Sequence, residues 1–202
     1  MQINLNNVGK RFNLEWIFRN LHHEFIAGKS YAITGSNGAG KSTLLQIIGG
    51  ALTHSEGAIS FLENNTNTII PTEQVYKEIS IVAPYLELIE EMTANEFLVF
   101  HKTFKRFHIS IEDMLLKVGL QSAANKQIRY YSSGMKQRLK LAQAFFSNSS
   151  ILLLDEPTTN LDNKGILLYH QLIEEFTSNR IVIVSSNDEV EYEFCKKIIR
   201  LN

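Results

Sequence analysis

Apolar residues along the chain gather in short runs that predict the strands of a sheet. Two runs, Ile151–Leu154 and Ile181–Val184, are continuous, which is typical of parallel strands that are covered on both faces. Residues 30–34, at the end of a longer apolar run at 22–34, are expected to form a short buried strand. In full, alternating or continuous apolar residues predict further strands at residues 2–8, 22–34, 57–62 and 78–83, the last ending at Pro84.

The middle of the chain has a helical periodicity instead. Residues 86–127 predict helices, and the segment from Thr93 to Glu96 is a capping box that opens one of them. A second helix is expected from Ser110 to Val118, stopped by Gly119. Strands and helices alternate on both sides of this region. The pattern therefore predicts an α/β fold whose core is interrupted by a mostly helical insert.

We expect a single domain, residues 1–202, with a core formed by residues 1–83 and 128–202 and a helical subdomain at 84–127. The Asn- and Thr-rich residues 63–68 predict a surface turn. The composition, 44% hydrophobic and 20% charged, is that of an ordinary globular protein.

Charge and cysteine content narrow the class of protein. The net charge of −1 gives no basic footprint for nucleic acid. One cysteine, Cys195, cannot form an internal disulfide and suits a reducing compartment. The first residues lack the pattern of a signal peptide, and the longest apolar runs are too short to span a bilayer. If the protein works at a membrane, another chain is expected to supply the membrane part.

A phosphate-binding loop lies between the strand at 30–34 and a helix expected at 42–48. Its spacing, Gly, four residues, Gly-Lys-Ser, lets successive backbone N–H groups point inward at a phosphate. Lys41 can reach the β- and γ-phosphates, the Ser42 hydroxyl can bind Mg²⁺, and the helix dipole turns its positive end to the phosphates. The nucleotide-binding candidates here are Gly35, Ser36, Asn37, Gly38, Ala39, Gly40, Lys41, Ser42 and Thr43.

Two carboxylates, Asp155 and Glu156, follow the apolar strand at 151–154. Parallel sheets place ligand sites at the carboxyl ends of their strands. Asp155 is therefore expected to hold Mg²⁺, usually through water, and Glu156 to polarise a water for attack on the γ-phosphate.

A second anion-binding candidate lies at Ser132, Ser133 and Gly134, just before a helix expected from Met135 to Phe146. Free backbone N–H groups and the helix dipole favour an anion there. On these physical grounds alone, an ordinary N-cap is the preferred interpretation.

The order of these motifs resembles the nucleotide-binding domain of ATP-binding cassette (ABC) proteins over essentially the whole chain. The signature motif of that family is Leu-Ser-Gly-Gly-Gln, and the segment from Tyr131 to Met135 aligns with it, keeping Ser132 and Gly134. The form Ser-Ser-Gly-Met-Lys-Gln-Arg is similar to variants of bacterial export-type cassettes. The segment from Thr159 to Asp162 matches the loop that the family places across its dimer interface.

The resemblance implies a P-loop NTPase fold of the ABC ATPase type, with a mixed sheet flanked by helices, and ATP and Mg²⁺ as cofactors. It implies a head-to-tail dimer, expected to be a homodimer, in which each ATP contacts one phosphate loop and Ser132 to Gly134 of the other subunit. ATP then holds the dimer together and hydrolysis releases it.

The same resemblance implies an integral-membrane transporter subunit as partner and a peripheral, cytoplasmic position at the inner membrane. The family's adenine-stacking aromatic aligns with Phe12. Core packing is an equal alternative for Phe12, and Trp16 is a rival stacker.

Two positions depart from the family pattern. The family usually has a histidine in a Ser-His-Asp context, and this chain has Ser186-Asn187-Asp188. Asn187 can donate a hydrogen bond through its amide but cannot carry charge, so we expect slower hydrolysis. Pro84-Tyr85 occupies the place of a common glutamine, and Tyr85 is expected to pack at the subdomain joint rather than contact the metal.

The function expected is an ATP-hydrolysing subunit that drives a separate membrane-spanning subunit, with the signature variant favouring export. One alternative is a regulatory or assembly cassette with a non-membrane partner. Another is a nucleotide-gated dimerisation module that barely hydrolyses, which Asn187 favours and Glu156 disfavours. A small-molecule kinase would not need the signature segment.

Overall fold

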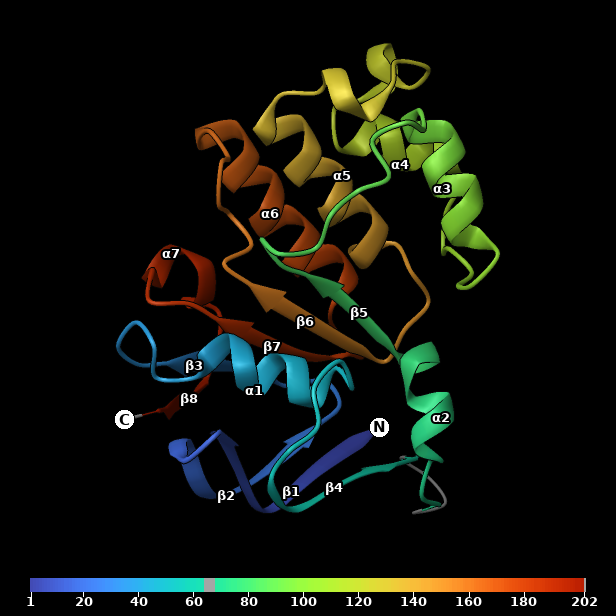
Figure 1. Ribbon diagram of the computed structural model, residues 1–202. Coiled ribbons are helices and arrows are strands. Elements are labelled where there is room, and N and C mark those ends of the chain that lie inside the picture. The colour runs from blue at the N-terminus through green and yellow to red at the C-terminus, as the bar shows by residue number, and fades with distance from the viewer. Residues whose placement is uncertain (64–67, 202) are drawn as a thin grey trace.

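The structure is a computed structural model that describes residues 1–63 and 68–201. The turn expected at 63–68 therefore falls mostly outside the described residues. The chain forms two sheets with helices around them (Figure 1).

The central sheet consists of parallel strands in the order β5-β6-β7-β3-β8. Every residue of β6 and β7 is buried, as continuous apolar strands covered on both faces should be. The carboxyl ends of β5, β6 and β7 point to the same side in Figure 1. The strand bounds are β3 Ser30–Thr34, β5 Ile79–Val82, β6 Ile151–Asp155, β7 Ile181–Ser185 and β8 Lys197–Arg200.

The second sheet is antiparallel, with the order β2-β1-β4 and the strands β1 Gln2–Phe12, β2 Glu15–Ile26 and β4 Glu56–Leu62. The continuous strand predicted at 22–34 is wrong, because Gly28 turns the chain with a φ of 74° before β3 begins. Most of β2 before residue 22 is exposed, so no apolar alternation marked its start. The expected mixture of strand directions is thus divided between two sheets.

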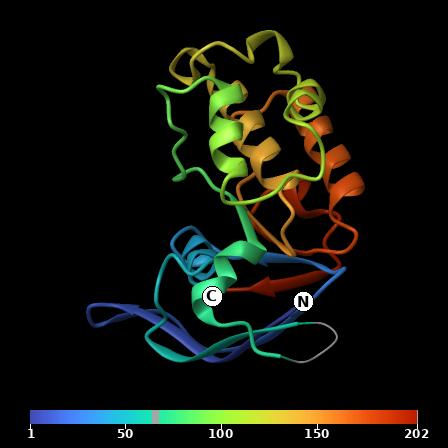
Figure 2. The same cartoon turned by 90° about the vertical axis from the view of Figure 1, so that its right-hand side faces the viewer.

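Helices cover both faces of the parallel sheet. In both views α5 and α6 lie on one side with α3 and α4 beyond them, whereas α1 and the antiparallel sheet lie on the other (Figures 1 and 2). Short 3₁₀ turns occur at 76–78, 121–123 and 128–130. The helix bounds are α1 Lys41–Ile48, α2 Thr72–Val75, α3 Ala94–Lys102, α4 Ile111–Lys117, α5 Ser133–Phe145, α6 Asn163–Phe176 and α7 Glu189–Tyr192.

The helical predictions are partly confirmed. The capping box is present, since the Glu96 N–H donates to Thr93 Oγ1 at 3.2 Å and the Thr93 N–H donates to Glu96 Oε2 at 2.8 Å. The helix expected at 110–118 is α4, capped by Ser110. The segment 86–127 is less helical than predicted, because long loops precede α3 and join it to α4.

Two buried apolar clusters lie on opposite faces of the parallel sheet. Leu152 and Leu154 belong to the cluster under α5 and α6, whereas Leu153 belongs to the cluster under α1. The alternation follows from the two-residue period of a strand, which points successive side chains to opposite faces. The sheet is therefore fixed from both sides, and its carboxyl edge is a rigid platform for loops.

Candidate active site

The phosphate loop joins the end of β3 to the start of α1 at the carboxyl edge of the parallel sheet (Figure 1). Lys41 is only 9% exposed, and its Nζ donates to the carbonyl oxygens of Gly35 at 2.9 Å and Ser36 at 3.2 Å. The ammonium group is thus held over the mouth of the loop by the loop itself. Ser36, Asn37 and Gly38 are exposed, while Ala39 and Gly40 are buried.

The start of α1 has the geometry of an anion site. Its N-cap is Gly40, in a left-handed conformation with a φ of 93°, and no side chain caps the helix. A Cβ at Gly40 would collide with Ile17 and Phe18 of β2, so both the backbone angle and the space require glycine. The N–H groups of the first turn, including those of Ser42 and Thr43, are left for an outside acceptor.

Asp155 and Ser42 suit a hard cation. Asp155 is 2% exposed, and its Oδ1 is buried without a hydrogen-bond partner among the described residues. An unpaired buried carboxylate oxygen is costly unless a ligand completes it. Among residues 1–63 and 68–201, no three His, Cys, Asp or Glu side chains gather into a metal cage. One carboxylate and one hydroxyl match Mg²⁺, which takes its other ligands from phosphates and water.

Glu156 differs sharply from its neighbour Asp155. It is exposed and adopts a left-handed backbone with a φ of 44°, a conformation that costs a non-glycine residue about 1–3 kcal/mol. Its N–H donates to the Ser185 carbonyl of β7 at 3.0 Å. With Asn37 and Asn187, Glu156 lines a cavity of about 460 Å³.

Asn187 contacts the phosphate loop directly. Its Oδ1 accepts a hydrogen bond from the Gly35 N–H at 3.3 Å, and its Nδ2 donates to Asn37 Oδ1 at 3.5 Å. The structure therefore brings together the phosphate loop, Asp155, Glu156 and Asn187 from three strand ends. The Asn187 side chain is exposed and makes its hydrogen bonds directly to the phosphate loop.

Sequence reasoning missed two polar residues that hold the loop after Glu156. Gln137, buried in α5, donates from Nε2 to the Pro157 carbonyl at 2.6 Å. Glu191, buried in α7, accepts from the N–H and hydroxyl of Thr158. The sequence offered no signal for Glu191, because Glu189 and Glu193 lie beside it and only tertiary packing sets which of these acids is buried.

Ser132, Ser133 and Gly134 lie away from the phosphate loop of their own chain. In Figure 1 the start of α5 lies beside the start of α6, at the end of these helices away from the parallel sheet, whereas the phosphate loop lies beside α1 on the other side of the sheet. The helix begins at Ser133, two residues before the predicted start, and Ser132 Oγ accepts from the Met135 N–H at 3.2 Å. The predicted N-cap is thus confirmed.

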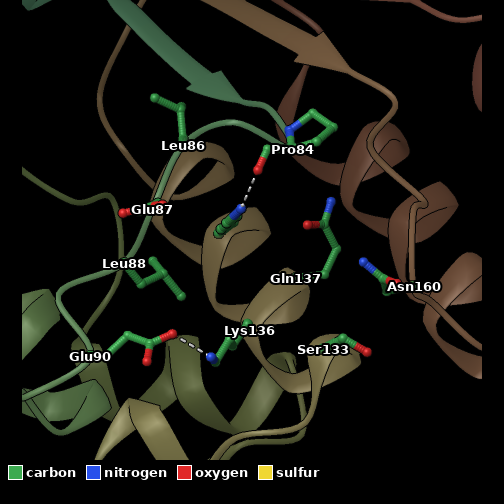
Figure 3. Close-up of a pocket in the computed structure, with 10 residues that line it drawn as sticks. Pro84, Leu86, Glu87, Leu88, Glu90, Ser133, Lys136, Gln137 and Asn160 are labelled. Atoms are coloured by element: carbon green, nitrogen blue, oxygen red, sulfur yellow. Dashed lines mark hydrogen bonds and ion pairs between the residues drawn. The ribbon is translucent and has the colours of Figure 1, made fainter.

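A cavity of about 480 Å³ borders this end of α5. Ser133, Lys136 and Gln137 line it from the helix, and the loop after β5 closes the other side (Figure 3). Lys136 pairs with Glu90 across it. Gly134 permits the close approach of the next loop, since a Cβ there would lie 3.0 Å from the Asn160 carbonyl oxygen.

The two aromatic candidates for adenine lie on the β1–β2 hairpin. Phe12 is 47% exposed with Lys10 Nζ 4.8 Å from its ring centre, so simple core packing does not describe it. Trp16 is 37% exposed, and the guanidinium groups of Arg19 and Arg11 lie 4.0 and 5.6 Å from its ring. Both rings therefore make cation–π contacts with basic side chains of the same hairpin.

Tyr85 lies beside the site rather than only at a subdomain joint. Burial and the nearby charge of Asp155 raise the pKa of Tyr85 to about 12, and a hydrogen bond with Gln46 of α1 opposes the rise. The hydroxyl therefore stays protonated at neutral pH.

Comparison with known proteins agrees with this geometry. The family model described as ABC transporter matches residues 18–159. The uncharacterized ABC transporter ATP-binding protein YybJ of Bacillus subtilis (strain 168) is 31% identical over 206 residues, covering 97% of this chain and 90% of that protein. The lantibiotic transport ATP-binding protein SrtF of Streptococcus pyogenes is 30% identical over 201 residues, covering 94% and 82%.

A solved structure with a similar fold is that of a dimeric ATP-binding cassette in a post-hydrolysis state, bound to ADP and Pi. Its TM-score is 0.81 at 27% identity, and the match covers 99% of this chain and 94% of that chain.

Proposed function

The chain belongs to the ABC transporter family of ATPases, and we propose that it is the subunit that binds and hydrolyses ATP to drive a separate membrane-spanning subunit. The observation that carries the proposal is the convergence of the phosphate loop, Asp155, Glu156 and Asn187 at one sheet edge. In the part of the chain that the structure describes, no helix is long and apolar enough to cross a membrane. We propose that a partner chain supplies the membrane path.

We assign the chemistry as follows. The loop amides and Lys41 bind the phosphates, and Lys41 offsets charge on the transferred phosphoryl group. Glu156 accepts a proton from the attacking water, and Asn187 fixes the loop and donates toward the γ-phosphate. Ser42 and Asp155 would hold Mg²⁺, which would supply charge neutralisation on the phosphate oxygens.

The working unit is proposed to be a head-to-tail homodimer with two ATP molecules between the subunits. The start of α5 does not approach its own phosphate loop (Figure 1), so Ser132 to Gly134 of one subunit cap the γ-phosphate held by the other. Phe12 is the proposed adenine platform. Residues 84–127 form the subdomain that faces the membrane partner.

The direction of transport is proposed to be export, at the cytoplasmic face of the inner membrane. The signature variant supports export, and SrtF, a lantibiotic transport ATP-binding protein, is one of the similar chains. Purification with the native membrane fraction tests this function. Capture of a polytopic membrane protein supports it, and repeated recovery of soluble partners alone contradicts it.

A second experiment tests the sandwich dimer directly. Glu156→Gln keeps the shape of the site but removes the proton acceptor, so MgATP should trap a stable dimer, measured by size-exclusion chromatography with light scattering. Glu174→Gln, an exposed acid on α6, is the matched control and should cycle normally. A Glu156→Gln variant that stays monomeric at saturating MgATP contradicts the model.

One observation favours a second function, a nucleotide-gated dimerisation module with weak hydrolysis. Asn187 stands at the switch position and is already engaged with Gly35. This function predicts that the wild-type chain itself forms a long-lived ATP dimer without releasing ADP. Rapid ADP release in a single-turnover measurement excludes it.

A further inference from the structure

Glu191 is a buried acid that the proposed chemistry does not use. It is 3% exposed and belongs to α7, the short helix that follows Asn187. Its Oε1 accepts hydrogen bonds from the Thr158 N–H at 2.7 Å and from the Thr158 hydroxyl at 2.6 Å. Burying a carboxyl group is costly unless it is hydrogen-bonded, and here both bonds go to one residue of another loop.

Glu191 is itself held in place from behind. The hydroxyl of Tyr169, a fully buried residue of α6, donates to the Glu191 carbonyl oxygen at 2.7 Å. Asp188 caps α7 by accepting from the Val190 N–H at 3.1 Å, and the Asp188 N–H donates to Ser186 Oγ at 2.9 Å. The acceptor that Thr158 contacts is therefore fixed relative to the end of β7.

The loop that Glu191 holds starts at the proposed catalytic carboxylate. Three elements secure successive residues of it: the Ser185 carbonyl of β7 accepts from the Glu156 N–H, Gln137 of α5 donates to the Pro157 carbonyl, and Glu191 accepts from Thr158. A left-handed residue such as Glu156 persists only where its surroundings determine it. Glu191 supplies the last of these three restraints.

We propose that Glu191 is a positioning residue for ATP hydrolysis. By holding Thr158, it fixes the direction in which Glu156 points into the cavity that both share with Asn187, and it joins the Glu156 loop to the Asn187 segment as one unit. It acts through the backbone and touches neither nucleotide nor water. This inference rests on the proposed function, in which Glu156 activates water.

Kinetics of Glu191→Ala test the inference. Misplacing a reacting group by about 1 Å can lower turnover by about 100-fold, so kcat should fall by about 10- to 100-fold. The KM for ATP should stay within about twofold, because an interaction made only in the transition state leaves ground-state binding intact. Glu191→Gln keeps one acceptor oxygen and should recover most of kcat. Glu189→Ala, an exposed acid on the same helix, is the matched control.

A second variant and melting curves distinguish a loss of positioning from a folding defect. Thr158→Val removes only the hydroxyl donor and should lower kcat less than Glu191→Ala does, with little change in melting temperature. Two results together overturn the inference. One is wild-type kcat in both Thr158→Val and Glu191→Gln. The other is either wild-type kcat or a raised KM in Glu191→Ala. If Glu191→Ala does not fold, wild-type kcat in Thr158→Val alone overturns the inference, and a lowered kcat with an unchanged KM supports it.

The dimer assay distinguishes this inference from the proposed function. Glu191→Ala should still form the ATP-dependent dimer, because its phosphate loop is intact. A wild-type chain that neither dimerises nor hydrolyses ATP overturns the proposed function and the inference with it. If the wild-type chain hydrolyses ATP and Glu191→Ala hydrolyses it equally fast, the inference is overturned but the proposed function is not.

Discussion

The N-termini of α1 and α5 are both assigned to phosphate, but they are built differently. α1 begins after a glycine in the left-handed region and has no side-chain cap. α5 begins after Ser132, whose hydroxyl accepts the Met135 N–H at 3.2 Å. The first leaves its N–H groups for a ligand, whereas the second already satisfies one of its own.

This difference suggests unequal roles for the two helix ends. The end of α1 brings glycines, Lys41 and the N–H groups of a helix without a side-chain cap together within eight consecutive residues. The end of α5 has the Ser132 side chain as its cap and borders a cavity of about 480 Å³. We therefore expect the α1 end to set affinity for ATP and the α5 end to respond to ATP that another subunit presents.

The largest test of this comparison mixes two inactive variants. Lys41→Ala removes the cation of the α1 end and Gly134→Asp places a negative charge at the α5 end, and each alone should lower turnover by about 100-fold or more. In a mixed dimer one of the two sites has an intact α1 end and an intact α5 end. Random pairing in a 1:1 mixture should therefore restore about a quarter of wild-type ATPase activity.

Lys77→Ala, far from both ends on the 3₁₀ turn after α2, is the control for the loss of a lysine. No recovery of phosphate release on mixing would show that the α5 end does not act across a dimer.

A smaller effect is expected at the side chain that bridges to the α1 end. Asn187→His should raise the steady-state rate of ATP hydrolysis several-fold, because imidazole reaches farther than an amide and can carry charge. Asn187→Ala should lower the rate, since it loses the bonds to Gly35 and Asn37. An Asn187→His rate at or below the wild-type rate would contradict this role.

The cap of α5 can be removed without touching α1. Ser132→Ala should lower the free energy of unfolding by about 1 kcal/mol, the usual value of an N-cap serine, as measured by urea denaturation. Ser133→Ala is the matched control, because the described structure gives its hydroxyl no hydrogen bond in the cap. Equal losses of stability in the two variants would remove the proposed asymmetry.

A last test concerns the far end of α5. His101 contacts Ser147 there and lies between Phe97 and Phe107. Burial and the nearby charge of Lys105 lower the pKa of His101 from 6.5 to about 4. The unfolded chain therefore binds more protons between these values, so the free energy of unfolding should fall as the pH is lowered from 6.5 to 4.

His101→Gln should flatten that decrease, which urea titrations at pH 7 and pH 5 can measure. The same pH dependence in the variant and in the wild type would assign it to other groups.

The site was predictable where its parts are contiguous in sequence. The phosphate loop and the Asp155-Glu156 pair each depend on a short segment whose order along the chain already specifies strand, loop and helix. The roles given to Phe12, Asn187 and Ser132 to Gly134 stay predictions, because they came from the resemblance and concern ligands.

The rest depended on contacts between distant residues. The partner of Gln137 is 20 residues away and that of Glu191 is 33 residues away, so no local pattern identifies either bond. The early part of β2 escaped prediction for a related reason: its side chains are largely exposed, and pairing with β1 rather than burial makes it a strand.

The left-handed backbone at Glu156 has a consequence for how this protein would respond to selection in the laboratory. Glycine adopts that conformation without a steric penalty. The Glu156→Gly variant should therefore have a free energy of unfolding about 1 kcal/mol higher than the natural chain. The same change removes the proposed proton acceptor for the attacking water. A screen that selects for thermal stability would therefore enrich inactive variants at this position. Stability and catalytic turnover thus oppose each other at a single residue.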